Sequence, residues 1–180
     1  MIDPAVTLGT AVIAIANVFL VIKTAGLVKV TQDTARRQLR AYVLLSKAKV
    51  DNGRIPNLRR AEIILRNFGS TPASKVRCWM GLDVREFPLT SGLREAGEDL
   101  WLSSDALGSD RESTLANAAP LQPSLESALL AGNAAVYAYG EARYMDIFGN
   151  ACHTRFRYFC RGGDLDSGRM SPYKDGNSYD

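Results

Sequence analysis

The chain has 180 residues, with 22 lysine and arginine residues, 19 aspartate and glutamate residues and one histidine, so its net charge is +3. This charge is too small to indicate a nucleic-acid-binding protein by itself. The three cysteines, Cys78, Cys152 and Cys160, form no CxxC or Cys/His pattern. Their number and spacing exclude the common zinc motifs and favour a reducing compartment over a disulfide-rich secreted domain.

Residues 5–22 contain no charged side chain and are rich in valine, isoleucine, leucine and phenylalanine. As a helix they would measure roughly 27 Å, close to the ~30 Å hydrocarbon core of a bilayer. We therefore expect one membrane-spanning helix. A secretory signal peptide cleaved near Ala25 is the alternative, although Asp3 stands where such a signal carries basic residues. A buried core helix is a weaker alternative, because the β-rich remainder offers it no obvious groove.

Basic residues follow the apolar segment and are opposed only by Asp33. The positive-inside rule therefore predicts a cytoplasmic C-terminal domain and an external N-terminus. The basic residues serve topology and solubility, and they would also attract anionic lipid at the membrane surface. They are Lys23, Lys29, Arg36, Arg37 and Arg40. The small-residue pairs Ala5/Gly9 and Thr10/Ala14 would let two such helices approach and form a homo-oligomer.

From residue 41 onward the pattern indicates β structure. Residues 41–50 and 60–68 are predicted strands, separated by a turn at 51–53, and the loop 69–72 ends the second strand. Residues 74–84 alternate most clearly, which is typical of a sheet with one buried face and one wet face. Their apolar face carries Val76, Cys78, Met80 and Leu82, and their polar face carries Lys75, Arg77, Trp79 and Asp83. We expect a loop to cover Trp79.

The region 88–123 gives weaker signals. Short strands are expected at 100–102 and 113–118, with a turn at 108–110 between them. Residues 124–130 are expected to form one or two helical turns with Ser124 as the N-cap.

Residues 134–148 and 152–160 are predicted to form a hairpin around a two-residue loop, Gly149-Asn150. In that register Asp146 faces His153 and Tyr144 faces Arg155. The predicted core face carries Tyr137, Tyr139, Met145, Ile147, Cys152, Phe156 and Tyr158. The predicted wet face carries Tyr144, Asp146, His153, Arg155 and Arg157. A bulge near Gly140 would re-aim Glu141 and Arg143, which otherwise fall on the apolar face.

These elements predict an antiparallel β-sandwich of immunoglobulin-like type, in preference to a barrel. The expected organisation is a membrane and juxtamembrane helix at 1–40, the sandwich at 41–160, and an extended or disordered tail at 161–180 pinned by Tyr173 or Tyr179.

Two segments resemble a known family. Residues 66–73 resemble an N-x-G-x-T-P-A signature, and residues 139–149 with 153–156 resemble Y-G-x-x-x-Y-x-D-x-F-G-x-x-x-x-T-x-F. With the leader TARRQLRAYV, they are similar to small, uncharacterised bacterial membrane proteins in which a short anchor precedes a β-rich domain. The resemblance implies this architecture and no activity.

The candidate binding residues are those of the wet hairpin face: Tyr144, Asp146, His153, Arg155 and Arg157. An Asp146–His153 pair would be able to orient a general base, but no serine or cysteine nucleophile accompanies it. A solvated cross-strand ion pair is the favoured interpretation. One histidine and one aspartate are too few for a metal site, and no phosphate-binding glycine loop is present.

The sequence thus favours a membrane-anchored, non-catalytic interaction or accessory module of a bacterial inner membrane, with no cofactor and no nucleic acid partner. Its expected partners are the lipid bilayer and another membrane or cytosolic protein. The alternative function is a membrane-tethered hydrolase that uses Asp146 and His153.

Overall fold

A computed structural model describes residues 4–51, 57–95, 97 and 100–180, with the backbone alone for residues 4–14. The chain divides into two compact units, Met1–Leu39 and Arg40–Asp180.

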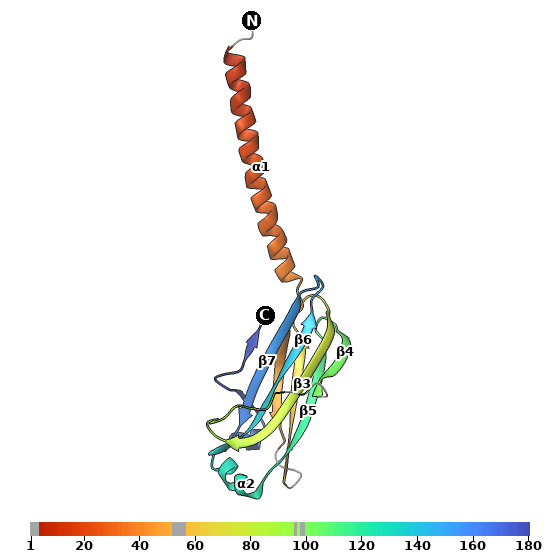
Figure 1. Ribbon diagram of the computed structural model, residues 1–180, viewed down its shortest axis with the longest axis vertical. Coiled ribbons are helices and arrows are strands. Elements are labelled where there is room, and N and C mark those ends of the chain that lie inside the picture. Colours follow the sequence, from red (N-terminus) through yellow and green to blue (C-terminus); the bar gives the residue numbers. More distant parts are fainter. Residues whose placement is uncertain (1–3, 52–56, 96, 98–99) are drawn as a thin grey trace. The chain divides into compact units, whose positions relative to one another are not determined.

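The first unit is formed by helix α1, Pro4–Gln38 (Figure 1). Proline is well tolerated at the first helical position, and no other proline interrupts the segment. The hydroxyl groups of Thr24, Thr31 and Thr34 donate to carbonyl oxygens four residues earlier. These polar side chains are therefore satisfied within the helix, as an apolar environment requires.

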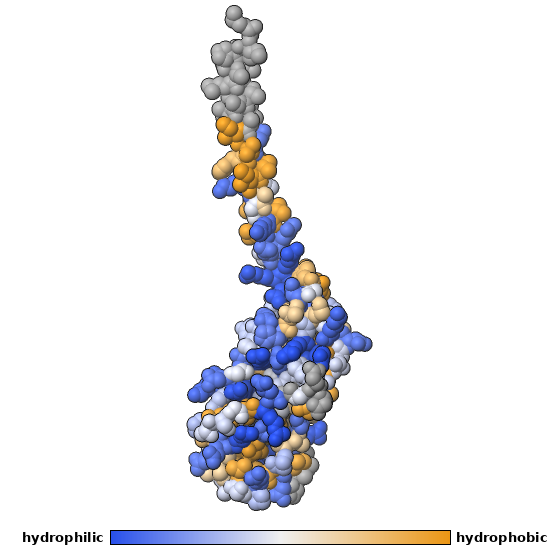
Figure 2. Space-filling model, viewed as in Figure 1, coloured by the Kyte–Doolittle hydropathy of each residue, from blue (hydrophilic) through white to orange (hydrophobic). Residues whose placement is uncertain are grey.

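The segment Ile15–Gln38 of α1 is long and apolar enough to cross a membrane, with a mean hydropathy of 1.3 and none of it buried. Figure 2 shows apolar side chains along the described part of α1 and a polar surface toward its C-terminal end. The predicted N-terminal apolar helix is confirmed. A secretion signal passes the same test of length and composition.

The second unit consists mainly of two antiparallel sheets (Figure 1). The smaller sheet has the strand order β1-β2-β5, and the larger sheet has the order β4-β3-β6-β7-β8, with β9 also paired to β7. The strands are β1 (Val43–Val50), β2 (Leu58–Asn67), β3 (Ala73–Glu86), β4 (Leu102–Leu107), β5 (Glu112–Pro120), β6 (Ala134–Met145), β7 (Ala151–Cys160), β8 (Ser171–Pro172) and β9 (Ser178–Tyr179). Two short helices, α2 (Pro123–Leu130) and α3 (Asp164–Ser167), connect them.

The main core lies between the two sheets. Val43 and Ile63 of the smaller sheet and Val136 and Phe156 of the larger sheet belong to one buried cluster. The long strands β2, β3, β6 and β7 contribute alternate residues to this cluster, which is the pattern of two sheets packed face to face. The expected antiparallel, sandwich-like domain is confirmed, whereas its immunoglobulin-like classification stays a prediction.

Strand β3 shows the predicted alternation. Val76, Cys78, Met80 and Leu82 are buried in the main core. Trp79 points to the opposite, outer face of the larger sheet, and it is buried there in a second cluster. The other buried members of that cluster are Ala135, Tyr137, Tyr139 and Tyr173. The expectation that Trp79 is covered is confirmed.

The predicted register of the last hairpin is wrong. In the structure Ala151 pairs with Met145 rather than with Phe148, a shift of three residues, and Arg143 faces His153. The connecting loop therefore spans residues 146–150 in place of two residues.

This shift reverses which face of β6 packs in the main core, because side chains alternate along a strand. Tyr144, expected to be wet, is buried, and Ile147, expected in the core, is 49% exposed. Glu141 and Arg143 lie on the outer face without any re-aiming, since the register runs continuously from Val136 to Met145 with no bulge at Gly140.

The outcome differs among several smaller expectations, and the Ser124 N-cap is wrong. Gln122, rather than Ser124, is the N-cap of α2. The last twenty residues contain α3, β8 and β9, and buried Tyr173 pins them while Tyr179 is 70% exposed. Most of the predicted turn at 51–53 lies outside the described residues, as do the side chains of Ala5, Gly9, Thr10 and Ala14.

Candidate functional site

A groove lies on the outer face of the larger sheet. It encloses about 440 Å³ and is lined by aromatic rings and charged side chains of β3, β6, β7 and the segment before β4. We call it the outer-face groove, and its principal residues are Trp79, Arg94, Glu95, Trp101, Tyr139, Glu141, Arg143, Arg155 and Arg157.

The strand register assembles this groove from residues far apart in sequence. Trp79, Glu141 and Arg155 stand in one row across β3, β6 and β7. Tyr139 and Arg157 are partners in the next row. Rings and guanidinium groups therefore lie side by side on one face of the sheet.

The floor of the groove is a set of rings in edge-to-face contact. Trp79 lies with its ring centroid 5.8 Å from that of Tyr139 and 6.3 Å from that of Trp101. The ring of Tyr139 lies across Gly81, where a side-chain Cβ would fall 2.5 Å from the ring. The Tyr139 hydroxyl donates to Asp83 at 2.9 Å. Burial, together with this hydrogen bond, raises the pKa of Tyr139 to about 12, so the hydroxyl stays protonated at neutral pH.

Glu141 organises the positive charges of the groove. Its carboxylate, only 10% exposed, forms a two-pronged ion pair with Arg143 at 2.9 and 3.1 Å. The Arg143 guanidinium in turn lies 4.7 Å from the ring centroid of Trp101. The same carboxylate is 3.7 Å from Nε of Arg155. One carboxylate thus contacts two guanidinium groups, and its contact with Arg143 is the shorter one.

Arg157 completes the positive rim. Its guanidinium lies 6.0 Å from the ring centroid of Tyr173 and packs against the backbone of Gly176. Its buried Nε has no hydrogen-bond partner among the described residues. A buried, charged donor without an acceptor is costly, so it is uncommon in folded proteins.

The chemistry of the groove suits binding. Its described lining contains no serine, threonine, cysteine or histidine side chain that would act as a nucleophile or base. Within the described part of the chain, no group of three histidine, cysteine, aspartate or glutamate side chains would hold a metal ion. Guanidinium groups beside aromatic rings bind anionic and planar groups.

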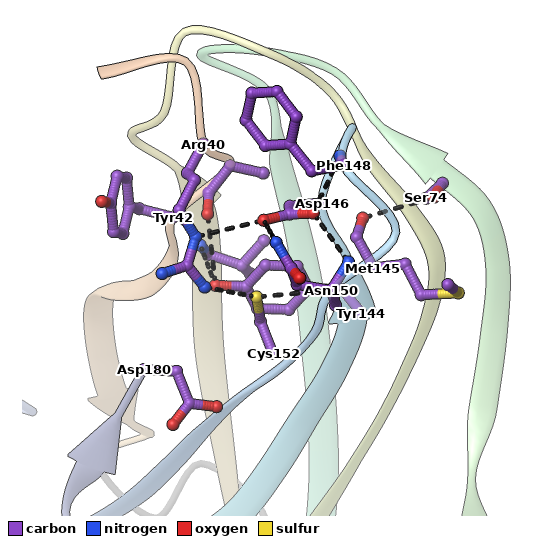
Figure 3. Close-up of polar contacts among 12 residues, drawn as sticks. Arg40, Tyr42, Ser74, Tyr144, Met145, Asp146, Phe148, Asn150, Cys152 and Asp180 are labelled. Atoms are coloured by element: carbon purple, nitrogen blue, oxygen red, sulfur yellow. Dashed lines mark hydrogen bonds and ion pairs between the residues drawn. The ribbon is translucent and has the colours of Figure 1, made fainter. Parts of the chain in front are cut away.

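Two predicted site residues, Tyr144 and Asp146, lie elsewhere, at the end of the sandwich that carries Arg40 (Figure 3). The Asp146 side chain is fully buried. It accepts hydrogen bonds at 2.9 Å from the backbone N–H of Phe148, the backbone N–H of Asn150 and the Asn150 side chain. Arg40 Nε also donates to it at 3.1 Å. Asp146 therefore organises the 146–150 loop and ties it to the start of the domain.

The surroundings of Asp146 stabilise its charged form. Burial alone would raise the pKa of this carboxyl group. The hydrogen bonds from Asn150 and Phe148 and the charge of Arg40 outweigh burial and hold the pKa of Asp146 below its ordinary value. An aspartate fixed as an anion in this way serves structure well and is a poor proton donor.

The predicted Asp146–His153 pair does not form. Nδ1 of His153 lies 2.5 Å from the carboxylate of Asp180, and the His153 backbone N–H donates to the same oxygen at 2.9 Å. Tyr144 is also occupied, because its hydroxyl accepts a hydrogen bond from the backbone N–H of Val43 at 3.3 Å. The longer loop causes the difference, since it moves Asp146 off the ladder that contains His153.

The structure thus brings Arg155 and Arg157 into the groove and leaves the other three predicted binding residues outside its lining. Sequence reasoning missed Trp101 and Arg143 as groove residues. Trp79 had a signal, since it was the one large ring on the polar face of the predicted strand 74–84. Arg143 had none, because the wrong hairpin register put it on the core face.

The predicted membrane-surface residues fall into two groups. Lys23, Lys29, Arg36 and Arg37 belong to α1, and Lys23 lies 5.3 Å from the ring centroid of Phe19. Arg40 belongs to the second unit. It binds Asp146, and its Nη2 lies 3.0 Å from Sγ of Cys152, so its role within the domain is to hold the 146–150 loop.

No family model matches the chain, and no curated protein is similar to it in sequence. Among solved structures, the chain is similar to a crystal structure from Bordetella pertussis described as ApaA, with 11% sequence identity. The match covers 68% of this chain and 95% of that chain, with a TM-score of 0.40. At this score the similarity supports no statement about fold or function, and the resemblance to a family of bacterial membrane proteins stays a prediction.

Proposed function

We propose that this protein is a membrane-anchored interaction module of a bacterial inner membrane, in which α1 is the anchor and the β-sandwich binds a partner without catalysing a reaction. The observation that carries the proposal is the outer-face groove. Its floor is aromatic, its rim is rich in arginine, and its described lining holds no serine, threonine, cysteine or histidine side chain. Large aromatic and arginine side chains dominate the energetics of protein interfaces.

The anchor is supported by the 24 residues Ile15–Gln38, which are long and apolar enough to cross a membrane. We further propose that the sandwich, which we class as immunoglobulin-like, faces the cytoplasm. The lysine and arginine residues at the C-terminal side of the apolar segment support this orientation. The three cysteines are free and buried, as suits a reducing compartment.

The alternative of a hydrolase that uses Asp146 and His153 has less support. Each of these residues is held by a different partner, Arg40 and Asp180 respectively. An aspartate orients a histidine as a base only through a direct hydrogen bond, and both side chains are engaged elsewhere.

Site-specific photo-crosslinking in bacterial membranes tests the interaction. A photoreactive amino acid replaces Trp101 or Arg155 in the groove, and in the control it replaces Glu62, which is exposed on β2 of the smaller sheet. We expect a discrete crosslinked partner from the groove positions alone. Equal crosslinking from both faces, or none from the groove, would contradict the proposal.

Reporter fusions after Asp180 test the orientation. We expect activity from a reporter that works only in the cytoplasm, because the basic residues follow the apolar segment. Activity from a reporter that works only outside would overturn the cytoplasmic assignment.

A further inference from the structure

We propose that the outer-face groove recognises a peptide segment in which a carboxylate lies next to an aromatic side chain. The inference rests on the proposed role as an interaction module and names the chemistry of the partner. It does not depend on whether α1 crosses a membrane.

The anionic half of this ligand is matched by Arg155 and Arg157. Glu141 is already committed to Arg143 by two short contacts, and its distance to Arg155 is 3.7 Å. Arg155 therefore keeps most of its five N–H donors for a ligand. Arg157 lines the same groove and adds a second guanidinium group to it. Guanidinium groups bind carboxylates through paired, charge-assisted hydrogen bonds.

The aromatic half is matched by the rings of the floor and wall. Trp79, Trp101 and Tyr139 border the groove beside the arginines. Their edge-to-face contacts fix the rings in place, so a ligand ring would meet a preorganised surface. The volume of about 440 Å³ is in the range of pockets that bind small organic groups, and it accommodates a side chain together with a neighbouring carboxylate.

The chain itself shows that this part of β7 pairs with an extended peptide segment. Strand β9 pairs with Thr154 and Arg155, and the carboxylate of Asp180 receives the His153 backbone N–H at 2.9 Å. The paired segment ends in Tyr179-Asp180, an aromatic residue followed by a carboxylate. This pairing shows that an extended peptide lies along β7. Asp180 contacts His153 and Tyr179 is 70% exposed, so the preference for a carboxylate and a ring rests on the arginines and the aromatic floor of the groove.

Tryptophan fluorescence provides a direct test. The chain has only two tryptophans, Trp79 and Trp101, and both line the groove. The full chain in detergent micelles is titrated with the probe acetyl-Glu-Phe-Glu-amide. Two matched peptides separate the contributions: Gln-Phe-Gln lacks the carboxylates, and Glu-Gly-Glu lacks the ring. Inorganic phosphate is the fourth probe. We expect a saturable change in tryptophan fluorescence with Glu-Phe-Glu, and we expect each of the other three probes to bind more weakly.

The variant Arg155→Gln removes one charged donor group from an exposed side chain, so folding should be retained. We expect this variant to bind Glu-Phe-Glu with about tenfold lower affinity, because a charge-assisted contact is lost. The matched control is Arg60→Gln, an exposed position on β2 of the smaller sheet, where affinity should not change. Affinity should also fall with added salt.

The inference is overturned if Gln-Phe-Gln binds as well as Glu-Phe-Glu, if phosphate alone reproduces the response, or if Arg155→Gln and Arg60→Gln behave alike. Such a result alongside groove-specific crosslinking would refute the acidic–aromatic ligand and leave the interaction module intact. Binding of the probe without any groove-specific crosslink would confirm the ligand chemistry and refute the proposed function.

Discussion

Asp146 is the residue that holds one end of the sandwich together. Its buried carboxylate accepts hydrogen bonds from Phe148, from Asn150 twice and from Arg40. We predict that Asp146→Ala lowers the free energy of unfolding by about 3 kcal/mol, because it leaves several donors without their acceptor. Urea unfolding followed by tryptophan fluorescence measures this. The control Asp105→Ala, at an exposed position of β4, should change stability by less than about 0.5 kcal/mol.

The lowered pKa of Asp146 also predicts a pH dependence. A carboxyl group whose pKa is lower in the folded state contributes stability above its unfolded pKa of about 4, and this contribution is lost as the pH falls through the folded value. The stability difference between the parent protein and Asp146→Asn should therefore shrink as the pH falls below about 4. A difference that stays constant from neutral to acidic pH would show that the charge of Asp146 contributes nothing.

Gly81 sets the position of the groove floor. A methyl group there would meet the ring of Tyr139 at 2.5 Å. We predict that Gly81→Ala displaces this ring, breaks its hydrogen bond to Asp83 and costs about 1–2 kcal/mol, the usual cost of overpacking. The tryptophan emission should shift as well, since Trp79 touches the same ring. Unchanged emission and stability would mean that the floor is not fixed by Tyr139.

At the scale of elements, the predictions that succeeded had a strong physical signal. Strand β3 shows a period of two because one of its faces is buried in the main core, whereas its outer face is exposed at Lys75 and Arg77 and buried at Trp79. The antiparallel fold followed from several such segments separated by turn residues. Alternation and turn residues are local patterns, so they can be read from a single sequence.

The prediction of the hairpin register failed because the loop depends on both a local and a distant interaction. Gly149-Asn150 is a good two-residue turn, yet Asp146 offers its carboxylate to the amides of Phe148 and Asn150 and stabilises a longer loop. The longer loop is also stabilised by Arg40, which donates a hydrogen bond to Asp146 although the two residues lie far apart in the sequence. The groove was therefore only half predictable: Arg155 and Arg157 were identified, whereas its aromatic wall depends on the true register.

The backbone conformation of the 146–150 loop can be tested at Gly149. Gly149 has a φ of +80°, and a methyl group added to its Cα would have no neighbour within 4 Å. We expect Gly149→Ala to cost about 1 kcal/mol through backbone strain alone. Gly92→Ala, where space is equally open and φ is not positive, should be close to neutral. Equal stabilities for the two variants would argue against the left-handed loop.

At the scale of the whole molecule, one unit is an apolar helix and the other is a β-sandwich that carries the outer-face groove. If α1 is an anchor, every copy of the groove acts at a membrane, and its partner must be a membrane protein or a protein recruited there. The rival interpretation of α1 is a signal sequence, which would release the sandwich on cleavage near Ala25. The two interpretations differ in whether the mature chain still contains the apolar segment.

The most direct measurement is therefore the membrane retention and intact mass of the full chain expressed in bacteria. Membranes are washed with alkaline carbonate and then with urea, and the retained protein is weighed by mass spectrometry. The account predicts a chain that resists extraction and still contains the apolar segment 5–22. A chain that is released by the washes, or that begins after Ala25, would contradict the central claim that α1 anchors this domain.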